Sequence, residues 1–183
     1  MLCLNFVPLL ALVLGAAFSQ DTPKKRCTLS KYGFPVPHEL QAVWKMKKEF
    51  EAIVTSSGFK CNTTLFHQKW ETAELSVEDR LTLVKAELDL AVTVLEASPT
   101  TRLPIFFQPL AFLTQAQKDV QDCVSVLPPS PEPSGKLKRW LHKLEMAKNS
   151  ETNGLKACTI FHLFQFLYDL KCAALQKQCT TKA

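Results

Sequence analysis

The sequence predicts an all-α domain: a four-helix bundle of up-up-down-down topology, with one extra short helix and disulfide staples. Two observations predict the helical class. Apolar residues recur every three or four positions in five segments, and no stretch alternates with period two for long. The composition is that of one folded domain, because 46% of the 183 residues are apolar and only 5 are glycine. The net charge of +5 is too small to indicate nucleic-acid binding.

The first residues form a targeting segment. Their apolar run is twelve residues long, shorter than the roughly 20 residues of a membrane-spanning helix. Small residues at Ala17 and Ser19 match the positions that a signal peptidase reads, so we expect a signal peptide over 1–19 and a secreted, extracellular domain over 20–183. A buried N-terminal helix is the alternative. In a secreted chain, we expect Asn62 of the Asn-Thr-Thr sequence to carry a glycan.

The first two helices are predicted over residues 37–54 and 77–96. Pro37 suits a first turn, because its missing N–H would be unpaired there anyway. Ser76 and Asp79 resemble a capping box with Asp in the Glu position. The two apolar stripes are Leu40, Val43, Met46, Phe50 and Ile53, and then Leu81, Val84, Leu88, Ala91 and Leu95.

Three further helices are predicted over 106–126, 136–148 and about 155–173. The prolines between 128 and 133 end the first of these, because proline cannot continue a helix. The apolar stripes are Leu110, Leu113, Ala116, Val120 and Cys123; Leu137, Trp140, Leu141 and Leu144; and Ile160, Leu163, Leu167, Leu170 and Ala174.

The lengths of the connections predict the topology. The links 55–76 and 127–154 have 22 and 28 residues, whereas the link 97–105 has nine. A helix of about 18 residues is roughly 27 Å long, and 22 residues at up to ~3.3 Å each can return along it. Nine residues can do so only when stretched nearly straight. Two long connections with a short one between them favour the up-up-down-down topology, the arrangement with two crossovers that is typical of helical cytokines.

Six cysteines remain once the signal peptide has removed Cys3. An even number in a secreted chain indicates three disulfides, and 15 pairings are possible. One geometric constraint applies. Cys172 and Cys179 would lie about 10.5 Å apart along a continuous helix, beyond the ~7 Å limit for a disulfide. If these two pair, the last helix must break soon after Cys172.

The residues show no catalytic or metal-binding pattern, so we expect no enzyme, no cofactor and no metal. No two histidines are four apart, no CxxC spacing indicates zinc, and no Gly-x-Ser-x-Gly or glycine-rich phosphate loop occurs. The Asp and Glu residues are scattered and are all expected on solvated helix faces.

Two groups of basic residues have two possible roles each. They could bind acidic glycans or an acidic receptor surface, or they could serve solubility, which we prefer. The groups are Lys136, Arg139 and Lys143 on one side of the short helix, and Lys24, Lys25 and Arg26 near the start.

The last helix is apolar nearly all round. Phe161, Phe164 and Tyr168, at steps of three and four, form an aromatic strip beside the core stripe. Either the short helix covers this aromatic strip, with Trp140 packing on it, or the strip anchors a protein partner. The pattern alone does not choose between them.

Several segments resemble the type III interferon (interferon lambda) family, in a bird-like form. The resemblance covers essentially the whole mature chain in order. It is carried by Cys27-Thr28-Leu29-Ser30-Lys31-Tyr32, Pro37-His38-Glu39-Leu40, Ala86-Glu87-Leu88-Asp89-Leu90, Gln108-Pro109-Leu110, Gly135-Lys136-Leu137-Lys138-Arg139-Trp140-Leu141-His142-Lys143-Leu144 and Phe161-His162-Leu163-Phe164-Gln165.

The resemblance implies a secreted antiviral cytokine. Such proteins bind and assemble a heterodimer of the interferon lambda receptor chain and the interleukin-10 receptor beta chain, which triggers JAK-STAT signalling and interferon-stimulated gene expression. We expect a monomer, no nucleic-acid partner and no membrane insertion. The alternative is a secreted helical carrier of apolar ligands, with its pocket in the bundle core.

The resemblance also implies site residues. Phe161 and Phe164 match the family's Phe-x-Leu-Phe block, which favours a partner contact for the aromatic strip. The other implied receptor-binding residues are Pro37, Leu40, Lys45, Lys47 and Phe59.

The family's disulfide pattern implies Cys27–Cys123 and Cys172–Cys179. It pairs Cys61 with a cysteine just after the glycine that precedes the last helix. Here Gly154 is followed by Leu155, and Cys158 comes about one turn later, or roughly 5.4 Å. We expect Cys61–Cys158 to form, with the loop shifted along the helix.

Overall fold

The computed structural model describes residues 27–56, 61, 66, 68, 70–97, 103–127, 132–149 and 158–180, and these contain helices and no strand. The expected signal peptide, Phe59 and Asn62 lie outside the described residues. The elements are α1 (Ser30–Gly33), α2 (Pro37–Ser56), η2 (Thr72–Glu74), α3 (Val77–Ala97), η4 (Pro104–Phe106), α4 (Phe107–Val126), α5 (Gly135–Lys148), α7 (Leu163–Leu175) and η5 (Gln176–Gln178).

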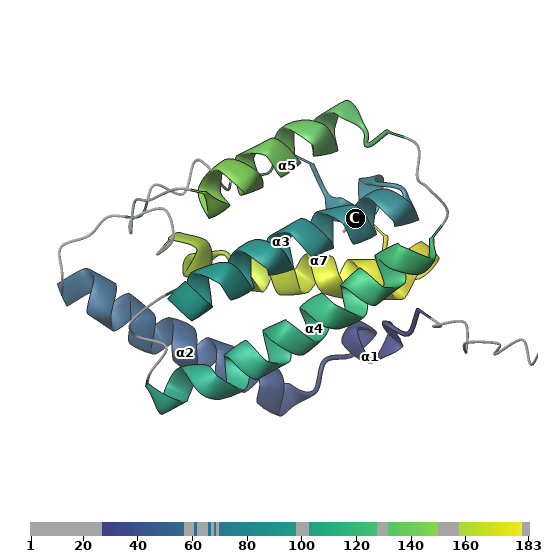
Figure 1. The fold of residues 1–183 in the computed structure, drawn as a ribbon. Helices are drawn as coiled ribbons and strands as arrows, with labels where there is room; N and C mark the ends of the chain where they lie inside the picture. The colour runs from purple at the N-terminus through teal and green to yellow at the C-terminus, as the bar shows by residue number, and fades with distance from the viewer. Residues whose placement is uncertain are drawn as a thin grey trace, which may run out of the picture.

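The up-up-down-down topology is confirmed. In Figure 1, α2 and α3 run in one direction through the bundle, and α4 and α7 run in the other. The helix α3 lies at the centre, in contact with α4, α5 and α7, while α1 packs against α7. Among the described residues, no helix has both the length and the apolar character needed to cross a membrane.

The predicted helix boundaries agree closely with the observed ones. Pro37 opens α2 as expected, and the Ser76 hydroxyl accepts a hydrogen bond from the Asp79 backbone N–H at 3.1 Å, which caps α3. The last helix differs, because residues 158–161 form a separate helical turn that ends at His162 before α7 begins. The short elements α1, η2, η4 and η5 were not predicted, since each is too short to show a period.

Apolar side chains fill the centre of the bundle. Leu88 of α3, Leu113 of α4 and Leu163 of α7 are fully buried. Most of α3 is buried on more than one face, because three helices surround it. The central position of α3 therefore lets the other elements dock around it, and it decides which of their faces remain exposed.

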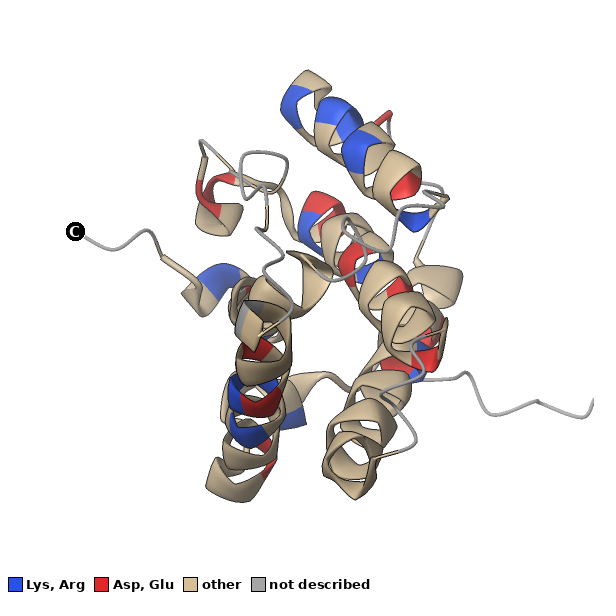
Figure 2. Ribbon diagram, turned by 90° about the vertical axis from the view of Figure 1, so that its left-hand side faces the viewer, with Lys and Arg blue, Asp and Glu red and all other residues tan. Residues whose placement is uncertain are grey.

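The short helix α5 lies on the outside of α3, at the top of the molecule in Figures 1 and 2. Its buried residues Leu137 and Leu144 face inward. Trp140 packs edge-to-face on Trp70, with ring centroids 6.3 Å apart, and its indole N–H donates to Glu87 at 3.4 Å. These contacts place Trp140 against α3 rather than over the aromatic strip.

In the described part of the chain three disulfides form. Cys27–Cys123 and Cys172–Cys179 are the pairs that the resemblance implies, and Cys61–Cys158 is the pair that we expected in spite of the shifted cysteine; the Cα–Cα distances are 4.5, 5.1 and 5.3 Å, respectively. The helical break required by Cys172–Cys179 is present. The helix α7 ends three residues after Cys172, and the chain reverses at Gln176, whose φ is +51°.

Two acidic residues contradict the expectation that every carboxylate lies on a solvated face. Glu87 of α3 and Asp169 of α7 are fully buried. Asp169 accepts hydrogen bonds from the Thr72 hydroxyl and from the Gln165 amide, the latter at 3.1 Å. Burial, together with the charge of Asp169, raises the pKa of Glu87 well above its usual range. Burial also raises the pKa of Asp169, to about 6, although these hydrogen bonds and one from Glu87 act in the opposite direction.

Arg80 ties the end of the chain to the start of α3. Its buried guanidinium donates to the backbone carbonyl of Leu75 at 3.0 Å, to that of Ala73 at 2.7 Å and to that of Gln176. One side chain thereby satisfies carbonyl groups of two separate turns.

Candidate functional site

The aromatic strip lies at the surface, in an intermediate state of burial. Phe161 and Phe164 pack partly against the core, and Phe161, Phe164 and Tyr168 are all of intermediate burial. An aromatic side chain that packs on one side and is open on the other is already ordered. Its side chain therefore loses little conformational entropy when a partner covers it. The structure therefore keeps the strip accessible.

The helix α2 forms the other wall of this surface. The rings of Phe50 and Phe161 meet edge-to-face, with centroids 5.8 Å apart. The ammonium of Lys47 lies 5.4 Å from the centroid of the Phe164 ring, within the range of a cation–π contact. Both contacts lie where the 158–161 turn and the first turn of α7 meet α2.

We define the α2–α7 surface as Leu40, Trp44, Lys47, Phe161, Phe164 and Tyr168. On α2 its members lie at positions i, i+4 and i+7, so they share one helix face. On the other side, Tyr168 follows Phe164 by one turn, in the direction that leads from Lys47 towards Leu40. The contact of Lys47 with Phe164 joins the two groups into one surface that carries aromatic rings and a cation.

Trp44 is the member that the sequence analysis missed. Its side chain is 52% exposed, and Lys48 Nζ lies 6.0 Å from its ring centroid. A signal for it was present, because a tryptophan directly after the core residue Val43 falls outside the three-and-four core stripe. A large apolar side chain off the stripe must either find a second partner or face solvent.

The positive charges on this side of α2 are partly balanced. Glu51 lies 3.7 Å from the ammonium of Lys47 and 3.3 Å from that of Lys48. Lys48 is largely exposed, whereas Lys47 and Glu51 are partly exposed, and ion pairs that solvent reaches contribute at most about 1 kcal/mol. An acidic partner group can therefore replace Glu51 at small cost.

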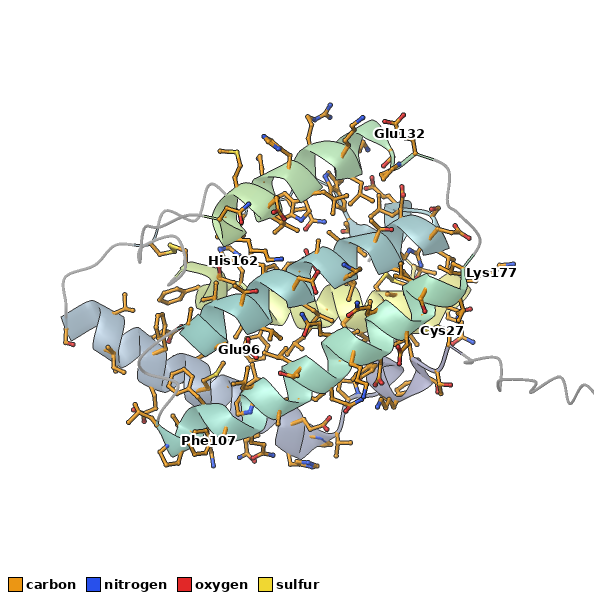
Figure 3. All side chains as sticks on the ribbon, viewed as in Figure 1. Cys27, Glu96, Phe107, Glu132, His162 and Lys177 are labelled. Carbon is orange, nitrogen blue, oxygen red and sulfur yellow. A yellow bond between two sulfur atoms is a disulfide. The ribbon has the colours of Figure 1, made fainter. Side chains whose placement is uncertain are left out.

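His162 packs behind the aromatic strip. Figure 3 shows it where residues 158–161 meet α7. Its ring stacks on the buried Phe66, with centroids 4.6 Å apart. Burial lowers the pKa of His162, and the charge of Lys47 acts in the same direction. The imidazole is therefore uncharged at neutral pH and serves to pack this turn, which presents Phe161 and Phe164.

The structure does not bring all the predicted receptor residues together. Leu40, Lys47, Phe161 and Phe164 share the α2–α7 surface. Lys45 is exposed but lies two positions from Lys47, about 200° around the helix, so it faces elsewhere. Pro37 is exposed at the first turn of α2, and Phe59 lies outside the described residues.

A hollow lies at the first turn of α2, on a different side of the helix from Leu40. It is lined by Lys31, Tyr32, Val36, His38, Glu39, Gln108, Ala111, Phe112 and Gln115, from α1, α2 and α4. Phe34 and Val36, which precede α2, are 80% and 47% exposed. The hydroxyl of Tyr32 donates to Asp119 at 2.7 Å, which holds α1 against α4. Apolar side chains are thus presented to solvent at a second, separate place.

The side chains of the α2–α7 surface are of the kind that binds another protein. In the described part of the chain, no group of three His, Cys, Asp or Glu side chains could hold a metal ion. The α2–α7 surface combines aromatic anchors with a cation, which is the composition of a protein–protein hot spot. Its geometry supports binding rather than chemistry.

Comparison with known proteins identifies the family. The sequence model of the family described as Interleukin-28A matches residues 24–176. The chain is 55% identical to interferon lambda-3 of Gallus gallus, over 98% of this chain and all of that relative. It is 33% identical to interferon lambda-2 of Mus musculus, over 98% and 100% of the two chains, and 32% identical to interferon lambda-1 of Homo sapiens, over 94% and 92%. The chain therefore belongs to the interferon lambda family, the type III interferons, and is of the bird type.

Proposed function

We propose that this antiviral cytokine is secreted and acts by assembling two receptor chains, the interferon lambda receptor chain and the interleukin-10 receptor beta chain. Signalling then runs through the JAK-STAT route to interferon-stimulated genes. The domain begins after a signal peptide over 1–19, and Asn62 carries a glycan. The relatives support this assignment, because they are interferon lambda proteins and the match covers nearly the whole length of this chain and of theirs.

The observation that carries the proposal is the α2–α7 surface, which we assign to the interferon lambda receptor chain. Phe164 is partly exposed and lies next to Lys47, and Trp44 is more than half exposed on the same face. Aromatic side chains that a partner fully covers dominate binding energies. A receptor loop with an apolar pocket and an acidic rim fits this surface, because the rim would meet Lys47.

The second receptor chain requires a second surface. The hollow between α1, α2 and α4 is a suitable place, since Phe34 and Val36 are exposed beside it and Phe112 lines it. The Cys27–Cys123 disulfide and the Tyr32–Asp119 hydrogen bond hold α1 in position there. We assign this surface to the interleukin-10 receptor beta chain.

The mechanism is geometric. A rigid ligand that binds both receptor chains keeps their kinase-bearing tails close together, which raises their effective concentration for one another. The three disulfides and the buried core supply the rigidity. A carrier of apolar ligands would need a pocket at the centre of the bundle, where Leu88, Leu113 and Leu163 pack, so nothing in the described residues favours that alternative.

The test uses two variants on the proposed receptor surface. Trp44→Ala and Phe164→Ala are expected to weaken binding to the interferon lambda receptor chain about 10- to 30-fold each, the size of a hot-spot loss. Interferon-stimulated transcripts in epithelial cells should fall in parallel. Met146→Ala is the matched control, because Met146 is 59% exposed on α5 and belongs to neither surface.

Circular dichroism and thermal unfolding establish that each variant folds. Trp44→Ala removes a mainly exposed side chain, so we expect this variant to fold normally even if Phe164→Ala is less stable. A folded Phe164→Ala protein with full receptor affinity and full antiviral potency would refute the assignment. Loss of binding in Met146→Ala would equally contradict it.

A further inference from the structure

Most of the net charge of this protein resides on one helix. In its 14 residues α5 carries five basic side chains and one acidic one, a net charge of +4, whereas the whole chain carries +5. Solubility alone does not require the positive charges to lie on one helix, since charges spread evenly over the surface would serve it as well. The distribution of charge, more than its amount, needs an explanation.

The basic residues of α5 point away from the bundle. The buried side of α5 faces α3 through Leu137, Trp140, Leu144 and Ala147. The opposite side is exposed and carries four of the five basic residues, Lys136, Lys138, Arg139 and Lys143, together with His142. Figure 2 shows the basic bands of this helix at the top of the molecule.

We name this exposed side the α5 basic face: Lys136, Lys138, Arg139, His142 and Lys143. Lys136, Arg139 and Lys143 lie at positions i, i+3 and i+7 and form a row about 10 Å long. Lys138 and His142, four positions apart, form a second row beside it. The face is therefore a strip of donors that follows the helix axis.

Few acidic groups neutralise the α5 basic face. Lys136 pairs with Glu74 at 3.4 Å, and Lys138 pairs with Glu132, and all four side chains are largely exposed. Such pairs are weak and exchange readily for another anion. Arg139 has no acidic partner within the described residues. Lys143 lies 5.8 Å from the centroid of the Trp140 ring, which positions it without neutralising its charge.

The face lacks what a protein partner would use. Its only large exposed apolar side chain within the described part of the chain is Met146, and Trp140 is buried beneath it. Protein interfaces centre on buried apolar anchors with charges at the rim. A row of guanidinium and ammonium groups without such a centre fits a linear polyanion instead, because arginine binds sulfate in a bidentate manner and lysine acts as a point charge.

We propose that the α5 basic face binds sulfated glycosaminoglycans of the cell surface and the extracellular matrix. The helix α5 lies on the opposite side of α3 from α2, as Figure 1 shows, so the α2–α7 surface stays free. A cytokine held on sulfated chains remains near the cells that secrete it and can still reach a receptor. This use goes beyond receptor assembly and does not depend on it.

The experiment measures binding to immobilised heparin by surface plasmon resonance, at physiological salt. The variant K138S/R139S/K143S is expected to weaken binding about 10-fold or more, since it removes three charge contacts. The control K118S/K171S/K177S loses the same charge from exposed positions on α4, α7 and η5, and should change binding less than twofold. Hyaluronan, which carries carboxylates but no sulfate, should bind weakly to all three proteins.

Several results would overturn the proposal. Equal losses in the two triple variants, on heparin and on a sulfonate cation exchanger alike, would mean that net charge alone is responsible. Loss of heparin binding in K24S/K25S/R26S, with none in the α5 variant, would assign the site to the N-terminal cluster. Equal binding to phosphatidylserine vesicles would indicate a surface for any polyanion. Receptor binding of the α5 variant should remain normal. A failure of the glycosaminoglycan proposal can therefore be distinguished from a failure of the proposed receptor function.

Discussion

The buried Asp169 predicts an unusual dependence of stability on pH. The folded protein holds the Asp169 proton up to a pKa of about 6, whereas the unfolded chain releases it near the ordinary value of 3.8. Between these values the folded state binds more protons, so the free energy of unfolding falls as the pH rises. The full cost at neutral pH is about 3 kcal/mol, of which roughly 2 kcal/mol develops between pH 4 and pH 7.

The substitution Asp169→Asn removes this contribution, together with the part of the raised pKa of Glu87 that the charge of Asp169 causes. Asparagine has no proton to release, so the variant lacks the slope that Asp169 causes. Whatever constant cost the lost hydrogen-bond acceptor has, the stability of Asp169→Asn relative to the parent should rise by about 2 kcal/mol from pH 4 to pH 7. Urea unfolding with intact disulfides, followed by circular dichroism at five pH values, measures the difference.

Two further variants provide comparisons for this measurement. Glu87→Gln should show a gain of the same sign, because the raised pKa of Glu87 also makes the folded state retain a proton. Glu96→Gln, an exposed position at the end of α3, should run parallel to the parent protein. His162 contributes a slope of opposite sign, since its pKa is lowered, but this slope is common to all variants and cancels in the differences. A constant offset between Asp169→Asn and the parent across the pH range would refute the reasoning.

Three further predictions concern a turn, a buried arginine, and two covalent features of the chain. Gln176→Gly should stabilise the protein by about 1 kcal/mol in urea unfolding, because a positive φ strains glutamine but not glycine; a loss of stability would contradict this. Arg80→Met should destabilise it by about 2–4 kcal/mol in the same assay, because three backbone carbonyls lose a buried donor; a change below 0.5 kcal/mol would show that solvent replaces the guanidinium. Non-reducing peptide mapping by mass spectrometry should find Cys61 linked to Cys158 and a glycan mass on Asn62, and free thiols at both cysteines would contradict the shifted disulfide.

Much of the fold could be predicted because its signals are local. The three-and-four spacing located the five helical segments, and the lengths of the links chose the topology. The requirement that Cys172 reach Cys179 predicted the break that the structure places at Gln176. Each of these follows from helix geometry and chain reach, which depend on neighbouring residues alone.

The candidate site could be predicted only in part. The spacing of Phe161, Phe164 and Tyr168 revealed a second apolar face, but not which element would border it. The contact of Phe164 with Lys47, and the inclusion of Trp44, depend on where the start of α7 meets α2. A periodic pattern shows that a face is apolar, and it does not show which other face docks there.

From the amino-acid sequence alone follow the helices, their order and direction, and the family of the protein. The tertiary structure alone decided that α5 docks on α3, that the aromatic strip stays open beside α2, and that Glu87 and Asp169 are buried between helices. The physical reason is that helix formation depends on short-range spacing, whereas burial depends on the competition of all apolar faces for the same core. The sequence around Glu87 predicts a solvated side chain, and only the packing of α3 against three other helices removes water from it.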